Sequence, residues 1–169
     1  MKRRVNKIIM ASLFAAFACL FTFIYIPLPL GYANLGDVIV ILGAFLLGPL
    51  YGVLAAGIGP ALADLFMGYA MYIPGTFVIK ALVALTFVIL YRTFSRKFKA
   101  NFVVFVLCAM LSECVMVGGY YLYESLLLGY GFAGAAASIY GNCMQGTVCA
   151  IIASVLHKPV SQLLANINK

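Results

Sequence analysis

Four acidic residues and one lysine stand inside or beside long apolar stretches, where charged groups are unusual. The acids are Asp37, Asp64, Glu113 and Glu124, which are all the acids in the chain, and the lysine is Lys80. Ionisable groups within a bilayer are costly, so they usually face the interior of a helical bundle and mark the path of a substrate or ion. These five residues therefore indicate a polar pocket inside a membrane protein.

Polar side chains also recur at helical spacing in three apolar stretches. The groups are Thr76 with Lys80; Glu113, Tyr120 and Glu124; and Ser138, Asn142 and Gln145. Spacings of three, four or seven residues place the members of each group on one face of a helix, so three faces can converge. The candidate substrate-binding residues are Asn34, Asp37, Asp64, Lys80, Glu113, Tyr120, Asn142 and Gln145.

Most of these polar residues also have a structural explanation. Asp37 suits the N-cap of the helix that follows it, and Asp64 and Glu124 suit solvated helix ends. Glu113 and Lys80 suit an ion pair between two helices, and the two amides of the last group suit hydrogen bonds between helices. Convergence from several helices toward one side favours the binding hypothesis.

The elements that must position these residues are membrane helices, because 66% of the 169 residues are hydrophobic and only 9% are charged. A soluble domain is usually about half apolar and about a quarter charged. The net charge is +7, but ten of the eleven Lys and Arg lie between or beyond the apolar stretches, which is the positive-inside pattern. We expect an all-α, multi-pass protein of the bacterial plasma membrane that contacts lipid and does not bind nucleic acid.

The apolar stretches predict about six transmembrane helices within a single domain, 1–169. The expected segments are 7–26, 38–47, 50–66, 75–91, 101–124 and 133–156, with a stop at the proline of residues 157–159. Gly48-Pro49 is expected to turn the chain between the second and third segments. No small-residue cleavage site follows the first segment, so we expect a retained helix rather than a signal peptide.

Charge also predicts the topology. The N-terminus, residues 92–99 and the C-terminal tail hold ten positive charges and no acid, whereas 27–36, 67–74 and 125–132 hold no Lys or Arg. Six segments with both termini cytoplasmic satisfy this pattern. The polar residues then lie in the outer half of the bundle, and 27–36 is an outer loop.

The sequence offers little support for metal binding, disulfide bonds or catalysis. There are five cysteines without a CxxC pair and one histidine, so we expect no metal, disulfide or cofactor. No GxxxxGK[ST] pattern occurs, and no nucleophile–base pair is apparent, so we do not expect an enzyme. Small residues repeat every fourth position at Ala11 and Ala15, a spacing that allows close helix approach within the bundle or to another membrane protein.

At these residues the chain resembles a substrate-binding S component of an energy-coupling factor (ECF) vitamin transporter. The resemblance covers nearly the whole chain and is strongest at 26–37 (IPLPLGYANLGD), 46–49 (LLGP) and 61–64 (ALAD). Within this family, the chain is similar to the riboflavin-type or hydroxymethylpyrimidine-type branch. The alanine row is also part of the family pattern, although Cys19 stands at its third position here.

The resemblance implies a division of labour between subunits. The S component binds a vitamin from outside, and the loop after its first helix closes over the ligand. A membrane T component and two ATPase subunits complete the importer, so ATP is hydrolysed on the partners. The resemblance further implies that Ala11 and Ala15 contact the T component.

The outer-side residues suggest the kind of substrate. Four acids and one lysine give a charge of −3 there, which disfavours a polyanion such as a folate. Tyrosines offer stacking surfaces with hydroxyls for a small heteroaromatic ring, namely Tyr32, Tyr69, Tyr72, Tyr120, Tyr121 and Tyr140. We expect hydroxymethylpyrimidine or pyridoxine, with riboflavin close behind. The alternative is a self-sufficient, proton-coupled secondary transporter in which Glu113 and Lys80 form the relay.

Overall fold

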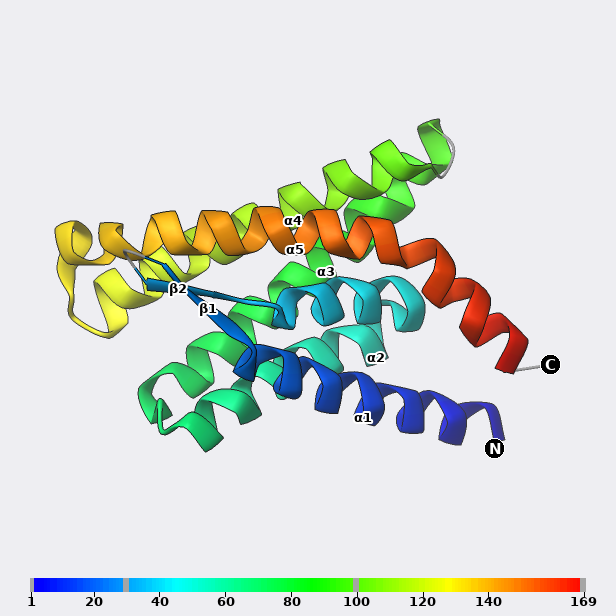
Figure 1. Ribbon diagram of the computed structural model, residues 1–169, viewed down its shortest axis with the longest axis horizontal. Helices are drawn as coiled ribbons and strands as arrows, with labels where there is room; N and C mark the ends of the chain where they lie inside the picture. Colours follow the sequence, from blue (N-terminus) through cyan, green and yellow to red (C-terminus); the bar gives the residue numbers. More distant parts are fainter. Residues whose placement is uncertain (1, 29–30, 99–100, 168–169) are drawn as a thin grey trace.

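The computed structural model describes residues 2–28, 31–98 and 101–167, with side chains for 4–26, 34–98 and 101–163 (Figure 1). The elements in chain order are α1 (Lys2–Phe23), β1 (Tyr25–Leu28), β2 (Gly31–Asn34), α2 (Gly36–Met67), η1 (Ala70–Tyr72), α3 (Ile73–Phe98), α4 (Phe102–Leu122), η2 (Tyr123–Leu127) and α5 (Gly131–Ile167). Both termini lie at one end of the bundle, and the strands and η2 lie at the other (Figure 1).

Helix α2 is two segments that fold back on each other at Gly48. The backbone of Gly48 has φ 77° and ψ −166°. This conformation is strongly disfavoured for any residue that carries a Cβ atom. The two halves then pack closely, since a Cβ at Gly52 would lie only 2.7 Å from the Gly43 carbonyl oxygen. The expected turn at Gly48-Pro49 is thus present, and five long apolar helices supply about six membrane segments.

The segment after α1 differs from the expected loop. Helix α1 ends at Phe23, three residues before its expected end, and β1 then pairs antiparallel with β2, with Tyr25 opposite Asn34. Pro27 explains the early end, because proline disfavours helical geometry in the residue before it and favours an extended chain there. The side chain of Tyr32 lies outside the described residues.

The last helix is longer than the sequence indicated. Helix α5 continues through Pro159 to Ile167, so the expected stop at 157–159 is wrong. A proline removes one backbone donor and bends a helix without necessarily ending it. Figure 1 shows the orange-to-red helix bending in this region.

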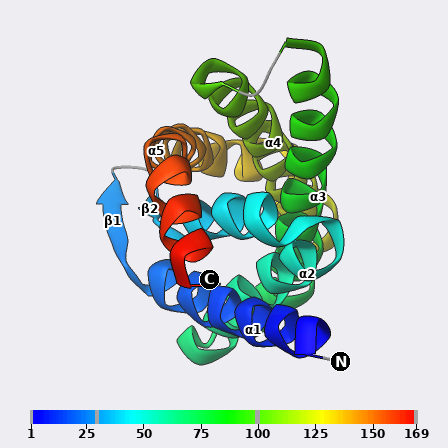
Figure 2. The same ribbon diagram turned by 90° about the vertical axis from the view of Figure 1, so that its right-hand side faces the viewer.

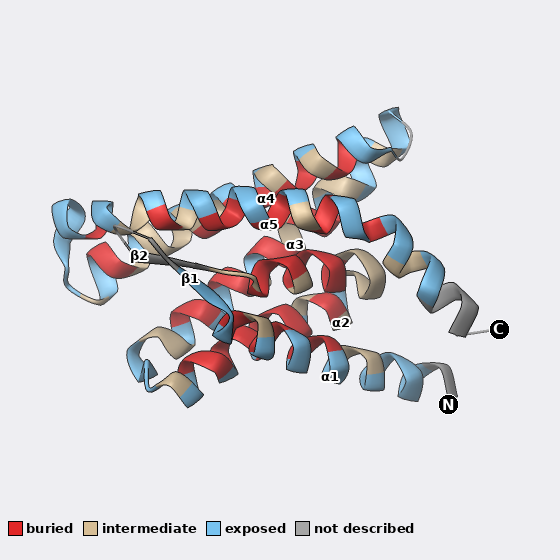
Figure 3. Ribbon diagram, viewed as in Figure 1, coloured by how far each residue is buried: buried red, intermediate tan, exposed pale blue. Residues whose placement is uncertain are grey.

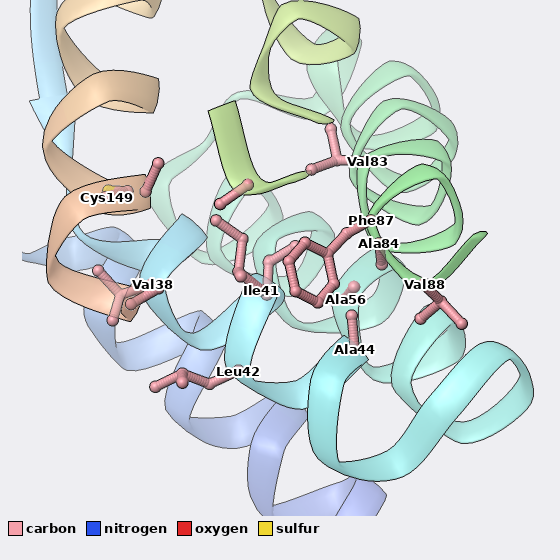
Figure 4. Packing of buried hydrophobic residues seen from close by; sticks show 14 of the residues in the cluster. Val38, Ile41, Leu42, Ala44, Ala56, Val83, Ala84, Phe87, Val88 and Cys149 are labelled. Carbon is pink, nitrogen blue, oxygen red and sulfur yellow. The ribbon is translucent and has the colours of Figure 1, made fainter. Parts of the chain in front are cut away.

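The core lies where α2, α3, α4 and α5 meet. Ile41 and Ala44 of α2 pack with Val83 and Phe87 of α3, all essentially inaccessible to solvent (Figure 4). In Figure 2, α2 lies between α1 and α4. Outward positions are largely exposed (Figure 3), and many carry large apolar side chains such as Leu107. An apolar exterior is what a lipid environment requires.

Candidate functional site

A cavity of about 200 Å³ lies between the helices and reaches β2, η1 and η2. Its lining comes from every helix, from the strand β2 and from the two short turns η1 and η2. The lining residues are Thr22, Asn34, Pro60, Asp64, Tyr69, Tyr72, Thr76, Lys80, Tyr120, Glu124, Ser138, Gly141, Asn142 and Gln145. Six of the eight candidate binding residues therefore line one cavity: Asn34, Asp64, Lys80, Tyr120, Asn142 and Gln145.

Lys80, which lines this cavity, forms an ion pair with Asp37 behind the wall. The Lys80 ammonium donates to Asp37 Oδ1 at 2.6 Å and to Oδ2 at 2.7 Å, and it also lies 2.9 Å from the Met116 sulfur. Relative exposures of 4% for Lys80 and 0% for Asp37 remove both side chains from solvent. A charge buried this deeply requires a partner, and this geometry supplies one at both carboxylate oxygens.

Gln145 connects this ion pair to the β-hairpin. Its amide nitrogen donates to Asp37 Oδ2 at 2.5 Å, and its amide oxygen accepts from the Asn34 side chain at 3.0 Å and the Asn34 backbone at 3.1 Å. Asn34 Oδ1 in turn accepts from the Gly36 backbone at 2.9 Å. The end of β2 is therefore held against α5 and the start of α2 by one continuous network.

Asp37 and Glu113 do not belong to the cavity lining. Asp37 lies behind Lys80, and its side chain does not cap α2, so the N-cap explanation is wrong. Glu113 is 3% exposed, and neither carboxylate oxygen has a hydrogen-bond partner among the described residues. The suggested Glu113–Lys80 ion pair is also absent from the described bundle, because Lys80 pairs with Asp37.

Asp64 and Glu124 are not solvated helix ends, since each is only 7% exposed. Both line the cavity, and Asp64 Oδ2 has no partner among the described residues. Burial follows from the packing of the outer turns over these carboxylates, which local sequence patterns do not record. These two acids bring negative charge to a cavity that Lys80 enters from α3.

Aromatic and hydroxyl groups complete the lining. Tyr69, Tyr72 and Tyr120 line the cavity, whereas Tyr121 and Tyr140 do not. The Tyr120 and Thr76 hydroxyls lie 3.0 Å apart and share a hydrogen bond. Sequence reasoning missed Thr22, Pro60 and Gly141 as lining residues. Thr22 could have been noticed as a hydroxyl in an otherwise apolar stretch, but Pro60 carried no such signal.

The row containing Ala11 and Ala15 borders a second, apolar groove of about 400 Å³ between α1 and α2. Its lining comprises Ile8, Ala11, Ser12, Ala15, Ala16, Tyr51, Leu54, Ala55, Ile58 and Leu62. Ala15 is also 8% exposed and packs inside the bundle, where a Cβ at Gly59 would clash with its carbonyl oxygen. The small residues thus allow α1 and α2 to approach closely and leave a groove along their outer edge.

Comparisons with known proteins agree with this architecture. A family model described as "ECF-type riboflavin transporter, S component" matches residues 2–162. A Pyrococcus woesei protein described as uncharacterized is 37% identical over 143 residues, covering 82% of this chain and 91% of that protein. The fold is similar to a structure described as the S component of a bacterial ECF transporter, with a TM-score of 0.70, 21% identity, and coverage of 95% and 98% of the two chains. The five long apolar helices and the extent of the family match identify this chain as a multi-pass membrane protein of the ECF-type riboflavin transporter S component family.

Proposed function

We propose that this substrate-binding transporter subunit captures a heteroaromatic vitamin or vitamin precursor with a single ring, such as hydroxymethylpyrimidine or pyridoxine. The size of the cavity carries this proposal. Drug-sized ligands occupy pockets of about 300–1,000 Å³, and this cavity is about 200 Å³. A single ring suits that volume better than the three fused rings and ribityl chain of riboflavin.

The chemistry of the lining supports a neutral ligand. Lys80 is the one cationic side chain among the described lining residues, and Asp37 already neutralises it. Asp64 and Glu124 add negative charge. A phosphorylated ligand would meet no free positive charge here, whereas a ring with amino or hydroxymethyl donors could bond to carboxylate and amide oxygens.

Calorimetry on the purified chain with four compounds tests the substrate. We expect hydroxymethylpyrimidine or pyridoxine to bind more tightly than riboflavin, and pyridoxine 5′-phosphate to bind more weakly than pyridoxine. The phosphorylated compound is the control because it keeps the ring and adds a charged phosphate group at one hydroxyl. Tighter binding of riboflavin than of both single-ring compounds would show that the substrate proposal is wrong.

We also propose that the apolar groove between α1 and α2 receives a membrane T component whose two ATPase partners energise import. Ser12 is exposed and lines this groove, whereas Leu20 is exposed on α1 outside it. Ser12→Trp should abolish copurification of the T component and uptake, with vitamin binding retained. Leu20→Trp should leave all three intact, and equal effects of the two changes would refute the groove as the docking site.

The competing function is proton-coupled transport without ATPases. One observation favours it: Glu113 is buried and has no hydrogen-bond partner among the described residues, as expected of a residue that exchanges protons. Purified protein in sealed vesicles separates the two functions. Uptake driven by a proton gradient, with no ATPase present, would support the competing function, and its absence would support the ECF importer.

A further inference from the structure

Two outer connections, η1 and η2, are joined by reciprocal tyrosine hydrogen bonds. The Tyr72 hydroxyl of η1 donates to Glu124 Oε1 of η2 at 3.3 Å, and the Tyr123 hydroxyl of η2 donates to the Met71 carbonyl oxygen at 2.6 Å. We call these four residues, Met71, Tyr72, Tyr123 and Glu124, the tyrosine clasp. The clasp bridges segments about fifty positions apart, so helix periodicity could not have revealed it.

Glu124 ties the clasp to a third element. Its second oxygen accepts from the Ser138 hydroxyl of α5 at 2.5 Å, and its carbonyl oxygen accepts from the Tyr130 backbone at 3.1 Å. Both carboxylate oxygens are therefore occupied, although the side chain is only 7% exposed. Such a fully bonded carboxylate holds the surrounding turns in one arrangement.

The aromatic rings of the clasp are held as closely as its hydroxyls. The Tyr72 and Tyr123 ring centroids lie 6.3 Å apart, and Tyr69 packs edge-on against Tyr72 at 6.4 Å. The Tyr123 ring also lies against the backbone of Gly75, where an added Cβ would come within 2.6 Å of the ring. The start of α3 thus leaves space for this ring only because residue 75 is glycine.

Members of the clasp also form the cavity wall, since Tyr72 and Glu124 line the cavity together with Tyr69 and Ser138. We propose that the tyrosine clasp determines specificity by fixing the width of the cavity, so that wide fused-ring ligands are excluded. A wider ligand must separate η1 from η2 and break their hydrogen bonds. Breaking one such bond reduces affinity by about 2- to 12-fold, and two bonds multiply the penalty.

Removing single hydroxyls tests this proposal, which rests on the proposed function. Tyr72→Phe and Tyr123→Phe each delete one clasp hydrogen bond and preserve the ring. We expect riboflavin affinity to rise about 2- to 12-fold relative to pyridoxine affinity. Tyr91→Phe is the matched control, because Tyr91 is neither a clasp nor a cavity residue and its loss of a hydroxyl should leave the ratio unchanged.

Failure of the two proposals gives different results. A wild-type preference for riboflavin refutes the single-ring substrate, whereas an unchanged affinity ratio in both clasp variants, with only a lower melting temperature, refutes the clasp. A measurement without vitamin covers the case in which neither compound binds. Asn142→Cys places a thiol in the cavity lining, in a background with the exposed Cys114 and Cys143 changed to serine.

The rates of labelling of that thiol by a small and a bulky aromatic thiosulfonate then report cavity width directly. Tyr72→Phe should accelerate the bulky reagent about 2- to 12-fold, the factor expected for one hydrogen bond, and leave the small reagent nearly unaffected. Equal acceleration of both reagents, or of neither, would overturn the proposal that the clasp limits width.

Discussion

The buried Asp37–Lys80 ion pair joins the packed interior of the bundle to the cavity wall. Lys80 lines the cavity, whereas Asp37 lies behind it and bonds to both Lys80 and Gln145. The acid therefore acts on the cavity through its neighbours. Both side chains are removed from solvent, so losing one of them leaves the other as an uncompensated buried charge. Comparing a single with a double mutation therefore separates an effect on folding from an effect on binding.

We predict that Lys80→Met alone lowers the free energy of unfolding by about 3–5 kcal/mol, because it leaves the buried Asp37 carboxylate unpaired. The double change Asp37→Leu with Lys80→Met should recover most of this loss. It should not recover vitamin affinity, because the cavity then lacks the Lys80 ammonium and Gln145 lacks its acceptor. Melting temperatures and dissociation constants of the same three proteins check this, and full recovery of binding would contradict it.

Glu113 presents the opposite case, a buried carboxyl group without a partner among the described residues. We predict that Glu113→Met raises the free energy of unfolding by about 1–3 kcal/mol, because an apolar side chain of similar length removes an unsatisfied polar group. Vitamin affinity should stay nearly unchanged, since Glu113 does not line the cavity. A large loss of affinity in calorimetry would return Glu113 to the binding site.

At the level of secondary structure, two connections shape the site: the β-hairpin and the turn at Gly48. They lie at opposite ends of the first half of α2. The β-hairpin precedes this segment and supplies Asn34 to the cavity, while Gly48 ends it and reverses the chain. Asp37 stands between them, one residue into α2. The position of the ion pair therefore depends on both connections.

For the hairpin, we predict that Asn34→Ala weakens vitamin binding by roughly 5- to 150-fold, the range expected when a buried partner is lost at about 1–3 kcal/mol. The change removes the side-chain donor to the Gln145 amide oxygen and the side-chain acceptor for the Gly36 backbone, while the backbone bond from residue 34 to Gln145 remains. The fold should persist, because the ion pair and the helix contacts remain. A lower melting temperature with normal affinity would show that this contact is structural.

For the turn in α2, Gly48→Ala should lower the free energy of unfolding by about 1–3 kcal/mol, because a Cβ is strained at φ 77° and ψ −166°. Gly118→Ala is the control. Gly118 lies in regular α4, and an added Cβ there would meet no atom within 4 Å, so it should be neutral or slightly stabilising. Thermal unfolding in detergent compares the two, and equal melting temperatures would refute the strain argument.

The whole molecule has two distinct ends. Both termini lie at one end together with the last turns of α3, and the hairpin and η2 lie at the other (Figure 1). The positive-inside pattern predicts that the first end faces the cytoplasm. In that orientation, the hairpin and the tyrosine clasp face the side from which a vitamin arrives.

Labelling of intact cells tests this orientation. In a background with Cys114 and Cys143 changed to serine, Arg96→Cys should react with an impermeant maleimide only after the membrane is opened, and Met71→Cys should react without opening. Met71 is a suitable outer position because it is 57% exposed. Reaction of residue 96 from outside would overturn the topology and the direction of capture.

The sequence by itself determined the membrane class, about six segments, the turn at Gly48-Pro49 and most of the cavity lining. Composition and the distribution of charge follow from the sequence alone, so they predict the membrane class without any knowledge of tertiary contacts. Helical periodicity was also sufficient to place Tyr120, Asn142 and Gln145 on inward faces. Composition, charge and periodicity are local signals, because each can be evaluated within a single segment of the chain.

Only the tertiary structure decided which polar groups meet. It paired Lys80 with Asp37 instead of Glu113, buried Asp64 and Glu124 and formed the clasp. Such pairings depend on the rotation of each helix and on contacts across long separations, as between Asn34 and Gln145, which are 111 positions apart. Periodicity defines the inward face of a helix but not the neighbour that this face meets, because the neighbour depends on packing of the whole bundle.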